Sequence, residues 1–445
     1  MQYHPITAED EAKILEAAGV SSFDDLVKGI PASLRNPKIN LPAGMNEMDV
    51  QNLIRSFGTK NQSTKTVSSF LGAGSYEHFV PSVVFEILAR SEFLTAYTPY
   101  QPEASQGTLQ AVFEYQSLIA ELTGLDVSNA SHYDGATSLA EACILAARHT
   151  GKSRIVAASS LHPAYREVLE TYLLSASFQL DSFAYQANLS FDRAALLKSL
   201  TDDTAAVVIQ TPNYFGIVED LTGLADELHA RGILLILAAN PISMGVLKTP
   251  GEWGADIAVG EGQPLGVPMS YGGPYLGYFA VTKELMRKIP GRIAGLTEDS
   301  NGNRAFVLTL QAREQHIRRE KAMSNICTNQ ALIALAATVY MTLMGKAGMR
   351  EVGEINLDRA AYLREQISKI KGFRVDLTQP IFNEFVVTSD KPFAEIEATM
   401  LKKGFFVGVP LEKHFPQLKN SFLVCATETK SKENLDAYVE ALSKC

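Results

Sequence analysis

Three segments of the sequence gather side chains that could bind a ligand or take part in a reaction. The first contains Ser75, Tyr76 and His78, after two glycines. The second, residues 97–107, offers hydroxyl, amide and carboxyl groups from Tyr97, Thr98, Tyr100, Gln101, Glu103, Ser105 and Gln106. The third offers Ser324, Asn325, Cys327 and Thr328, after a basic turn that contains Arg313, Arg318, Arg319 and Lys321. Arginines there could hold a carboxylate or phosphate through paired hydrogen bonds, or could form a solvated helical face.

The loop at residues 97–107 is stiff, because Pro99 and Pro102 fix two backbone φ angles. A stiff loop rich in polar and aromatic side chains suits the wall of a binding pocket or a subunit interface. It could equally be a well-packed turn whose tyrosine rings cover the core. Composition alone leaves both interpretations open.

A run of small and hydroxyl residues, 131–138, precedes an expected helix. Free N–H groups at a helix start can cradle a phosphate, but the same residues make an ordinary N-cap, which is the more common case. His132 within the run is more easily explained as structural than as catalytic. The Gly72–Gly74 pair follows no strand and lacks a third glycine, so it does not indicate a dinucleotide site. The HExxH, GxSxG and GxxxxGKS motifs do not occur in the sequence.

Short apolar runs alternate with helical segments in the middle of the chain. Strands are expected at 154–159, 205–212, 233–241, 255–260 and 275–282, and helices at 109–122, 134–150, 162–174 and 221–232. This alternation predicts an α/β domain with a mostly parallel sheet covered on both faces. The glycine- and proline-rich stretch 252–282 then lies at strand ends, where α/β proteins place ligand sites.

The chain divides into three predicted parts. Residues 1–60 form a helical extension, with capping signals at Thr7–Asp10 and Ser22–Asp25 and a helix at 46–58. Residues 61–330 form the large α/β domain. Residues 331–445 form a smaller α+β domain, with helices at 349–370, 392–404 and 432–444 and strands at 373–377, 383–389 and 422–429.

Composition excludes several classes of protein. The 445 residues carry a net charge of −9, which argues against nucleic acid or an anionic membrane as the main partner. The four cysteines are far apart, so zinc motifs and a disulfide framework are not expected. The first residues show no secretory or transit signal, and the apolar stretch 331–345 is too short to span a membrane and predicts a buried helix. We expect a bacterial cytoplasmic protein that binds no metal.

Four long motifs resemble the glycine cleavage system P-protein family, the decarboxylating glycine dehydrogenases. They are residues 70–84, 97–110, 252–280 and 319–332, and the resemblance runs over essentially the whole chain. It is strongest to subunit 1 of the form that is divided into two chains. The resemblance implies the fold-type I pyridoxal-phosphate-dependent transferase architecture.

The resemblance also implies a reaction and a set of partners. Glycine would react through pyridoxal phosphate, lose its carboxyl group as CO₂ and pass its aminomethyl group to the lipoyl arm of H-protein. Subunit 2 would be the partner, with two copies of each subunit in the assembly.

The chain departs from the family pattern where the cofactor should be anchored. The family's Lys-bearing subunit has its lysine where this sequence has Gln263 and Pro264. The strand 233–241 ends in Ala238, Ala239 and Asn240, without the acid that usually faces the pyridine nitrogen. Lys248 and Lys283 flank the region outside that local context. Because an amide cannot form an imine, we expect the partner subunit to hold pyridoxal phosphate covalently and this chain to supply no catalytic lysine.

The resemblance therefore favours a subunit that is inactive alone and completes its partner's site. The three segments above are the candidates for lining the cofactor and substrate pocket or the lipoyl channel. Two alternatives stay open, a purely structural or regulatory subunit and a free-standing pyridoxal-phosphate decarboxylase or aminotransferase.

Overall fold

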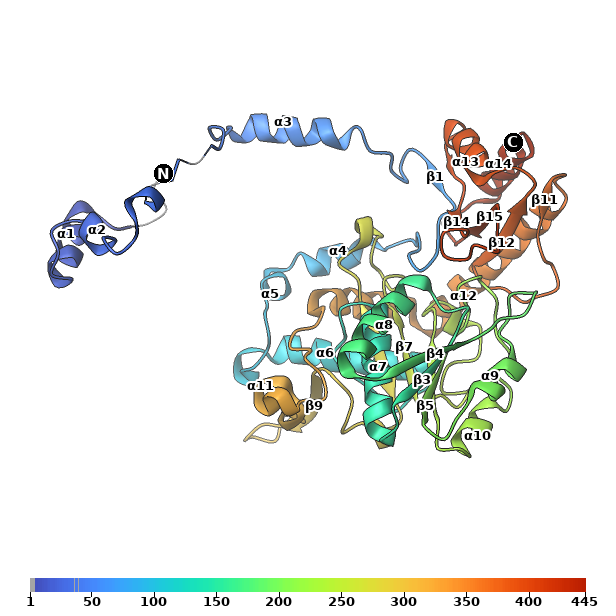
Figure 1. Ribbon diagram of the computed structural model, residues 1–445, viewed down its shortest axis with the longest axis horizontal. Helices are drawn as coiled ribbons and strands as arrows, with labels where there is room; N and C mark the ends of the chain where they lie inside the picture. The colour runs from blue at the N-terminus through green and yellow to red at the C-terminus, as the bar shows by residue number, and fades with distance from the viewer. Residues whose placement is uncertain (1–4, 36, 39) are drawn as a thin grey trace. The chain divides into compact units, whose positions relative to one another are not determined.

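The computed structural model describes residues 5–35, 37–38 and 40–445, and its contacts divide the chain into two units, Met1–Gln62 and Ser63–Cys445. The first unit holds α1 (Ala8–Ala17), α2 (Phe23–Leu26) and α3 (Glu47–Gly58), seen at the blue end of the ribbon in Figure 1. Thr7 and Asp10 form a capping box, and Ser22 and Asn46 each accept a hydrogen bond from the third N–H of their helix. These caps confirm the predicted helix starts.

Among the described residues of the second unit, seven strands form the main sheet in the order β2-β8-β7-β6-β5-β3-β4. Their bounds are β2 (Val127–Ser128), β3 (Arg154–Ala158), β4 (Gln179–Phe183), β5 (Thr204–Gln210), β6 (Leu234–Ala238), β7 (Ile257–Glu261) and β8 (Gly277–Val281). The strands from β3 to β7 pair in parallel, whereas β8 runs antiparallel to β7 and β2. The prediction of a mostly parallel sheet is confirmed.

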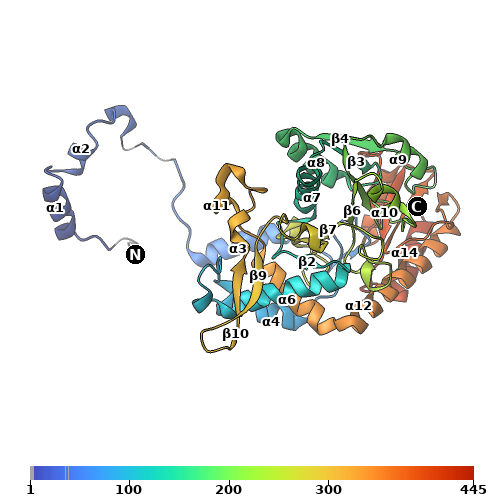
Figure 2. The same ribbon diagram turned by 90° about the horizontal axis from the view of Figure 1, so that it is seen from below.

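Helices cover both faces of this sheet, as Figures 1 and 2 show. The helices of this part of the chain are α4 (Ser82–Leu88), α5 (Ser91–Leu94), α6 (Gln106–Thr123), α7 (Gly135–Thr150), α8 (Pro163–Ala176), α9 (Arg193–Ser199), α10 (Leu224–His229), α11 (Gln315–Arg318) and α12 (Ala331–Ser368). One core packs α7 and α8 against the sheet, and another packs α6 and α12 against the opposite face. Gly124 and Gly151 end α6 and α7 in the left-handed conformation that glycine adopts at low cost.

The sequence analysis missed two strands of the main sheet and one hairpin. β4 lies at the sheet edge and alternates weakly, and β2 has only two residues. The hairpin joins β9 (Ile293–Glu298) to β10 (Arg304–Thr309), which are half-exposed, although β10 contains the short apolar run 305–308. Short or edge strands carry too little periodicity to be recognised without their partners.

The helix α12 includes the apolar stretch 331–345. By length and composition it is the one helix among the described residues that could cross a membrane. Its apolar half packs in the core instead, because Ala334, Ala337 and Tyr340 are buried in the cluster shared with α6. The predicted buried helix is therefore confirmed, and it continues through a kink at Gly345, where φ is +56°, into the second predicted helix.

The C-terminal part contains an antiparallel sheet in the order β11-β12-β15-β14. Its elements are β11 (Phe373–Arg374), β12 (Glu384–Ser389), α13 (Phe393–Lys402), β13 (Phe405–Phe406), β14 (Val409–Pro410), β15 (Ser421–Cys425) and α14 (Lys432–Ser443). The short strand β1 (Ser68–Ser69) pairs in parallel with β13, so the segment that follows it starts beside this C-terminal sheet. The three-part division at residues 60 and 330 stays a prediction.

Candidate functional site

The strand-end site is the region where the fold would place a cofactor, between the ends of β6 and β7 and the start of α7. Asp134 caps α7 by accepting a hydrogen bond from the N–H of Thr137 at 2.8 Å. The helix start therefore contains the ordinary cap that the sequence analysis favoured. A phosphate would still need the remaining first-turn N–H groups and free space in front of them.

The carboxyl group of Glu261 occupies that place. Its Oε2 accepts a hydrogen bond from the N–H of Gly135 at 3.0 Å, and its Oε1 accepts from the N–H groups of Gln263 at 3.0 Å and Leu276 at 2.8 Å. Burial raises the pKa of this carboxyl to about 8, while the three N–H donors act in the opposite direction. Glu261 was not predicted from the sequence, because a single acid in a glycine-rich loop matches no motif of a binding or catalytic site.

Gln263, which stands where the resemblance places the lysine, binds backbone groups. Its Nε2 donates to the carbonyl oxygens of Tyr76 at 3.0 Å and Val267 at 2.6 Å, and its Oε1 accepts from the N–H of Tyr76 at 2.9 Å. The side chain is 0% exposed. Gln263 therefore joins the segment at Tyr76 to the loop after β7 through these three hydrogen bonds.

The rings of Tyr165 and His162 narrow the space for a pyridine ring. They lie 5.0 Å apart, and the cavity at the ends of β6 and β7 measures about 30 Å³, far below the ~300 Å³ or more of usual ligand pockets. An open cavity of about 440 Å³ adjoins it and shares His162, Tyr165 and Glu261 in its lining. The end of β6 offers no acid, because Ala238, Ala239 and Asn240 stand there. The Oδ1 of Asn240 accepts a hydrogen bond from the N–H of Ile242. Lys248 lies over the ring of Trp253. The residues present do not fit pyridoxal phosphate.

The first predicted segment bridges the strand-end site and the C-terminal part. The hydroxyls of Ser75 and Tyr275 are 2.6 Å apart, and the hydroxyl of Tyr76 donates to Glu384 at 2.7 Å. The other carboxyl oxygen of Glu384 accepts from the N–H of Ala73. Burial raises the pKa of Glu384 to about 7, against the effect of these two donors.

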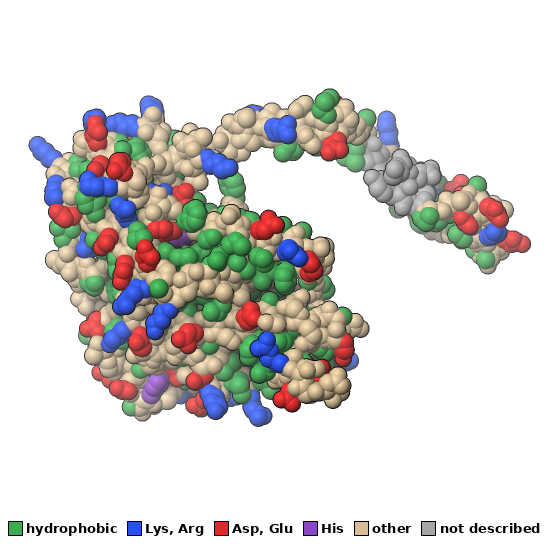
Figure 3. All heavy atoms as spheres, turned by 180° about the vertical axis from the view of Figure 1, so that it is seen from behind, with side chains coloured by type: hydrophobic (Ala, Val, Ile, Leu, Met, Phe, Trp, Pro, Cys, Tyr) green, Lys and Arg blue, Asp and Glu red, His purple; other side chains and the backbone are tan. Residues whose placement is uncertain are grey.

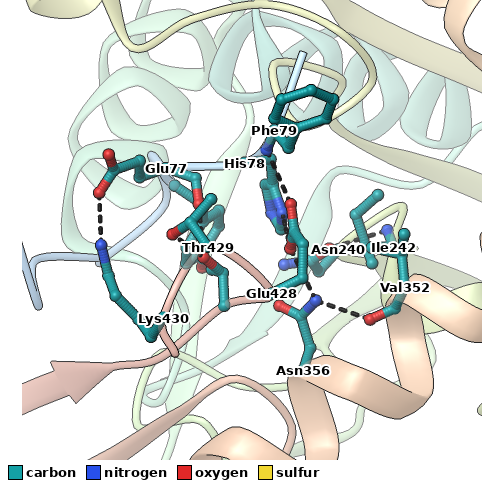
Figure 4. A network of polar contacts seen from close by, with 12 residues as sticks. Glu77, His78, Phe79, Asn240, Ile242, Val352, Asn356, Glu428, Thr429 and Lys430 are labelled. Carbon is teal, nitrogen blue, oxygen red and sulfur yellow. Dashed lines mark hydrogen bonds and ion pairs between the residues drawn. The ribbon is translucent and has the colours of Figure 1, made fainter. Parts of the chain in front are cut away.

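The next residues continue this bridge, as Figure 4 shows. His78 Nδ1 lies 2.8 Å from Glu428 Oε2, and the N–H of Phe79 donates to Glu428 Oε1 at 2.8 Å. Glu77 pairs with Lys430 at 2.6 Å. His78 and Tyr76 are thus placed by contacts with the C-terminal sheet and its following loop, and these contacts hold the two parts together.

The second and third predicted segments meet around Arg292. Its Nη2 donates to the hydroxyl of Tyr100 at 2.9 Å and lies 4.0 Å from the sulfur of Cys327. The guanidinium is 3.8 Å from the carboxyl of Glu314, and both side chains are buried. Arg313 donates to the carbonyl of Ile289, and burial lowers its pKa to about 10. We call Arg292, Arg313, Glu314, Tyr100 and Cys327 the arginine cluster.

The arginine cluster contains buried polar atoms without a hydrogen-bond partner among the described residues. They are Nε of Arg292, Nε and Nη2 of Arg313, and Oε1 of Glu314. Such atoms are rare in folded proteins, so each calls for a water, an ion or a partner group. The sequence analysis named Arg313 but missed Arg292 and Glu314, which lie outside any motif.

The other predicted residues lie on the surface around this cluster. Tyr97 is 78% exposed and lies at a small cavity between α6 and the start of α12, and Gln106 pairs with the backbone of Phe306 in both directions. The exposed set is Gln101, Glu103 and Asn325, and the half-buried set is Thr98, Ser105, Ser324 and Thr328. Pro264 is buried beside Gln263. The structure thus brings the second and third segments together, whereas the first segment serves the strand-end site.

Comparisons with known proteins identify the family of this chain. The family model for the Glycine cleavage system P-protein matches residues 1–442. Proteins named "Probable glycine dehydrogenase (decarboxylating) subunit 1" are similar to this chain. The one from Chlorobium luteolum is 50% identical, with 98% of each chain covered. The one from Anoxybacillus flavithermus is 47% identical, with 99% of this chain and 98% of that protein covered.

Solved structures extend the comparison to the fold. The crystal structure of a glycine decarboxylase (P-protein) of the glycine cleavage system, in inhibitor-bound form, matches with a TM-score of 0.91 and 42% identity over 100% of both chains. The sphingosine-1-phosphate lyase of Burkholderia pseudomallei shares the fold, with a TM-score of 0.67, 15% identity and 93% of each chain covered. The predicted fold-type I architecture is confirmed, and the chain belongs to the glycine cleavage system P-protein family.

Proposed function

We propose that this chain is one subunit of a decarboxylating glycine dehydrogenase in the bacterial cytoplasm. Its relatives carry that name as subunit 1, which implies a partner subunit. In this proposal the partner holds pyridoxal phosphate on its own lysine, and the assembly contains two copies of each subunit. Glycine is the substrate, CO₂ leaves, and the lipoyl arm of H-protein receives the aminomethyl group.

The observation that supports a contribution from this chain is the arginine cluster. Arg292 is 5% exposed, and its Nε lies 3.8 Å from Glu314 but has no hydrogen-bond partner among the described residues. The exposed Tyr100 and Cys327 lie directly beside it. A fixed guanidinium of this kind can pair with an anionic group that a neighbouring chain or a substrate brings to it. We propose that the cluster forms one wall of the partner's active site and orients an anionic group there.

A second function, a purely structural subunit, has its own support. Figure 3 shows hydrophobic side chains gathered on the face of the second unit that carries α4, α6 and α12. Exposed apolar residues of α4, α5, α12 and the segment before α4 include Phe79, Val83, Phe85, Leu94 and Leu343. A patch of this kind marks an interaction surface and would serve a scaffold as well as a catalytic subunit. A free-standing pyridoxal-phosphate enzyme has no such support, because the strand-end site does not fit the cofactor.

The decisive experiment compares variants in the assembled complex. The chain is co-expressed with its Lys-bearing partner, and glycine- and H-protein-dependent CO₂ release is measured for wild type, Arg292→Met and the control Arg374→Met. Arg374 lies on the C-terminal sheet, paired with Asp390 on the surface. We expect kcat/KM to fall at least about tenfold for Arg292→Met and to stay unchanged for the control.

Two outcomes would contradict the proposal. Full activity of the assembled Arg292→Met complex would favour the structural subunit, and CO₂ release by this chain alone would refute the need for a partner. If Arg292→Met does not assemble, Tyr100→Phe tests the same wall with a smaller change. Its hydroxyl bonds Arg292 directly, so we expect a smaller loss in the same direction.

A further inference from the structure

The carboxyl group of Glu261 is held as a bound ligand would be held. Backbone N–H groups from three separate segments, at Gly135, Gln263 and Leu276, donate to its two oxygens at 2.8–3.0 Å. The side chain is only 8% exposed. Convergent N–H donors at a helix start are the usual cradle for a phosphate group.

The surrounding chain is shaped to keep the carboxyl in place. Gly135 has no side chain, and a Cβ there would lie 2.0 Å from the hydroxyl of Tyr165 and 2.7 Å from the backbone nitrogen of Glu261. Glycine thus lets β7 and α8 approach the start of α7 this closely. Gln263 fixes the loop that follows Glu261 through its three hydrogen bonds.

An open cavity of about 440 Å³ lies directly in front of this group. Its lining includes Ser75, Tyr133, His162, Tyr275 and Glu261 itself. A small solute can therefore reach the carboxyl from outside, but the carboxyl blocks the last step to the N–H groups of α7.

We propose that Glu261 is a built-in substitute for a cofactor phosphate, which closes a cryptic anion site at the start of α7 to phosphate monoesters. Removing this side chain should convert the cradle into a phosphate site that opens to the cavity. The inference rests on the geometry of this chain alone and holds whether or not the proposed reaction is correct.

The test measures binding of inorganic phosphate to the purified full chain by equilibrium dialysis. Wild type is compared with Glu261→Ala at constant ionic strength in chloride. The matched control is Glu219→Ala, because Glu219 is also a buried carboxyl that accepts backbone N–H bonds, from Phe191. We expect one phosphate per chain with a Kd of about 1 mM or below for Glu261→Ala, and binding at least about tenfold weaker for wild type and control.

The same comparison with pyridoxal phosphate and with pyridoxal separates the phosphate from the ring. The proposal predicts that Glu261→Ala gains affinity for the phosphorylated form and not for pyridoxal. Saturable phosphate binding by wild type, or a folded Glu261→Ala that binds none, would overturn it. If Glu261→Ala does not fold, Glu261→Asp withdraws the carboxyl by one methylene, and phosphate should then raise its Tm more than that of wild type.

Discussion

The strand-end site and the arginine cluster are both built from buried polar groups, but they differ in how those groups are satisfied. In the first, every side-chain oxygen and nitrogen of Glu261 and Gln263 has a hydrogen-bond partner within the chain, and the buried atoms without one, Nδ2 of Asn240 and of Asn383, belong to neutral amides. In the second, the charged groups of Arg292, Arg313 and Glu314 leave buried atoms unpartnered among the described residues, beside the exposed Tyr100. An unpartnered buried atom costs more free energy on a charged group than on an amide. The difference favours the arginine cluster as the region that binds a partner group.

The largest expected effect comes from restoring the missing lysine. Gln263→Lys buries an ammonium group that has no counter-charge in place of a fully bonded amide, so we expect the free energy of unfolding to fall by about 3–5 kcal/mol. Borohydride reduction with excess pyridoxal phosphate should give no stoichiometric adduct at position 263, because the carboxyl of Glu261 already accepts from the N–H groups that the phosphate would need. The exposed Gln51→Lys is the control for added charge. A stoichiometric adduct at position 263 would show that only the lysine was lost.

The next effect is the dependence of stability on pH. Burial raises the pKa of Glu261 to about 8 and that of Glu384 to about 7, from an ordinary value near 4.5. At pH values between the ordinary pKa and the raised pKa of each carboxyl, the folded chain binds a proton that the unfolded chain has released. The free energy of unfolding therefore falls as pH rises through this range. Burial also raises the pKa of Glu141 and of Glu219 to about 7, so these carboxyls act in the same direction. We expect the free energy of unfolding to drop by about 2–4 kcal/mol between about pH 6.5 and 8.5.

Urea unfolding at several pH values checks this expectation, with Glu261→Gln as the variant that should flatten the slope. The pKa values of the buried His132 and His162 are lowered by burial, so both groups are neutral in the folded chain throughout this window. Near pH 6.5 the unfolded chain still binds protons on them, because an ordinary histidine is about half protonated there, so these two groups raise stability slightly up to about pH 7.5 and offset a minor part of the fall. A stability that stays constant or rises toward pH 8.5 would mean that the buried carboxyls are already charged when folded.

A smaller effect is expected at the bridge to the C-terminal sheet. Tyr76→Phe keeps the buried ring but removes the donor to Glu384, which should cost about 1–2 kcal/mol of unfolding free energy. It should also move the pKa of Glu384 further up, because that hydrogen bond lowers it. The control is Tyr271→Phe, whose side chain is almost fully exposed. Equal stabilities for the two variants would show that the hydrogen bond from Tyr76 to Glu384 does not stabilise the folded chain.

The smallest effect on the isolated chain is expected at Tyr97, which lies at the small cavity between α6 and the start of α12. Tyr97→Ala should change the free energy of unfolding by less than about 0.5 kcal/mol, because the side chain packs on little else. In the assembled complex the same variant should lower activity or assembly measurably. If Tyr97→Ala changes neither the stability of the isolated chain nor the activity and assembly of the complex, Tyr97 lies outside the interface.

Much of the fold could be predicted from local signals. Capping residues such as Thr7, Ser22 and Asn46 marked helix starts, and the β-branched runs of β3, β5, β6 and β7 marked the central strands. β2, β4 and the β9–β10 hairpin escaped prediction, because edge and half-exposed strands depend on their neighbours for stability. The candidate loops were found by composition, and their roles stay predictions.

The sequence by itself determined the family, through four long motifs, and the resemblance predicts that Gln263 and Asn240 stand where a cofactor site would carry a lysine and an acid. Only the tertiary structure decided which contacts these side chains make. Gln263 meets Tyr76 across 187 positions, and Arg292 meets Tyr100 across 192. Hydrogen bonds between such distant residues depend on how sheets and helices pack together, and a local pattern carries no record of that packing.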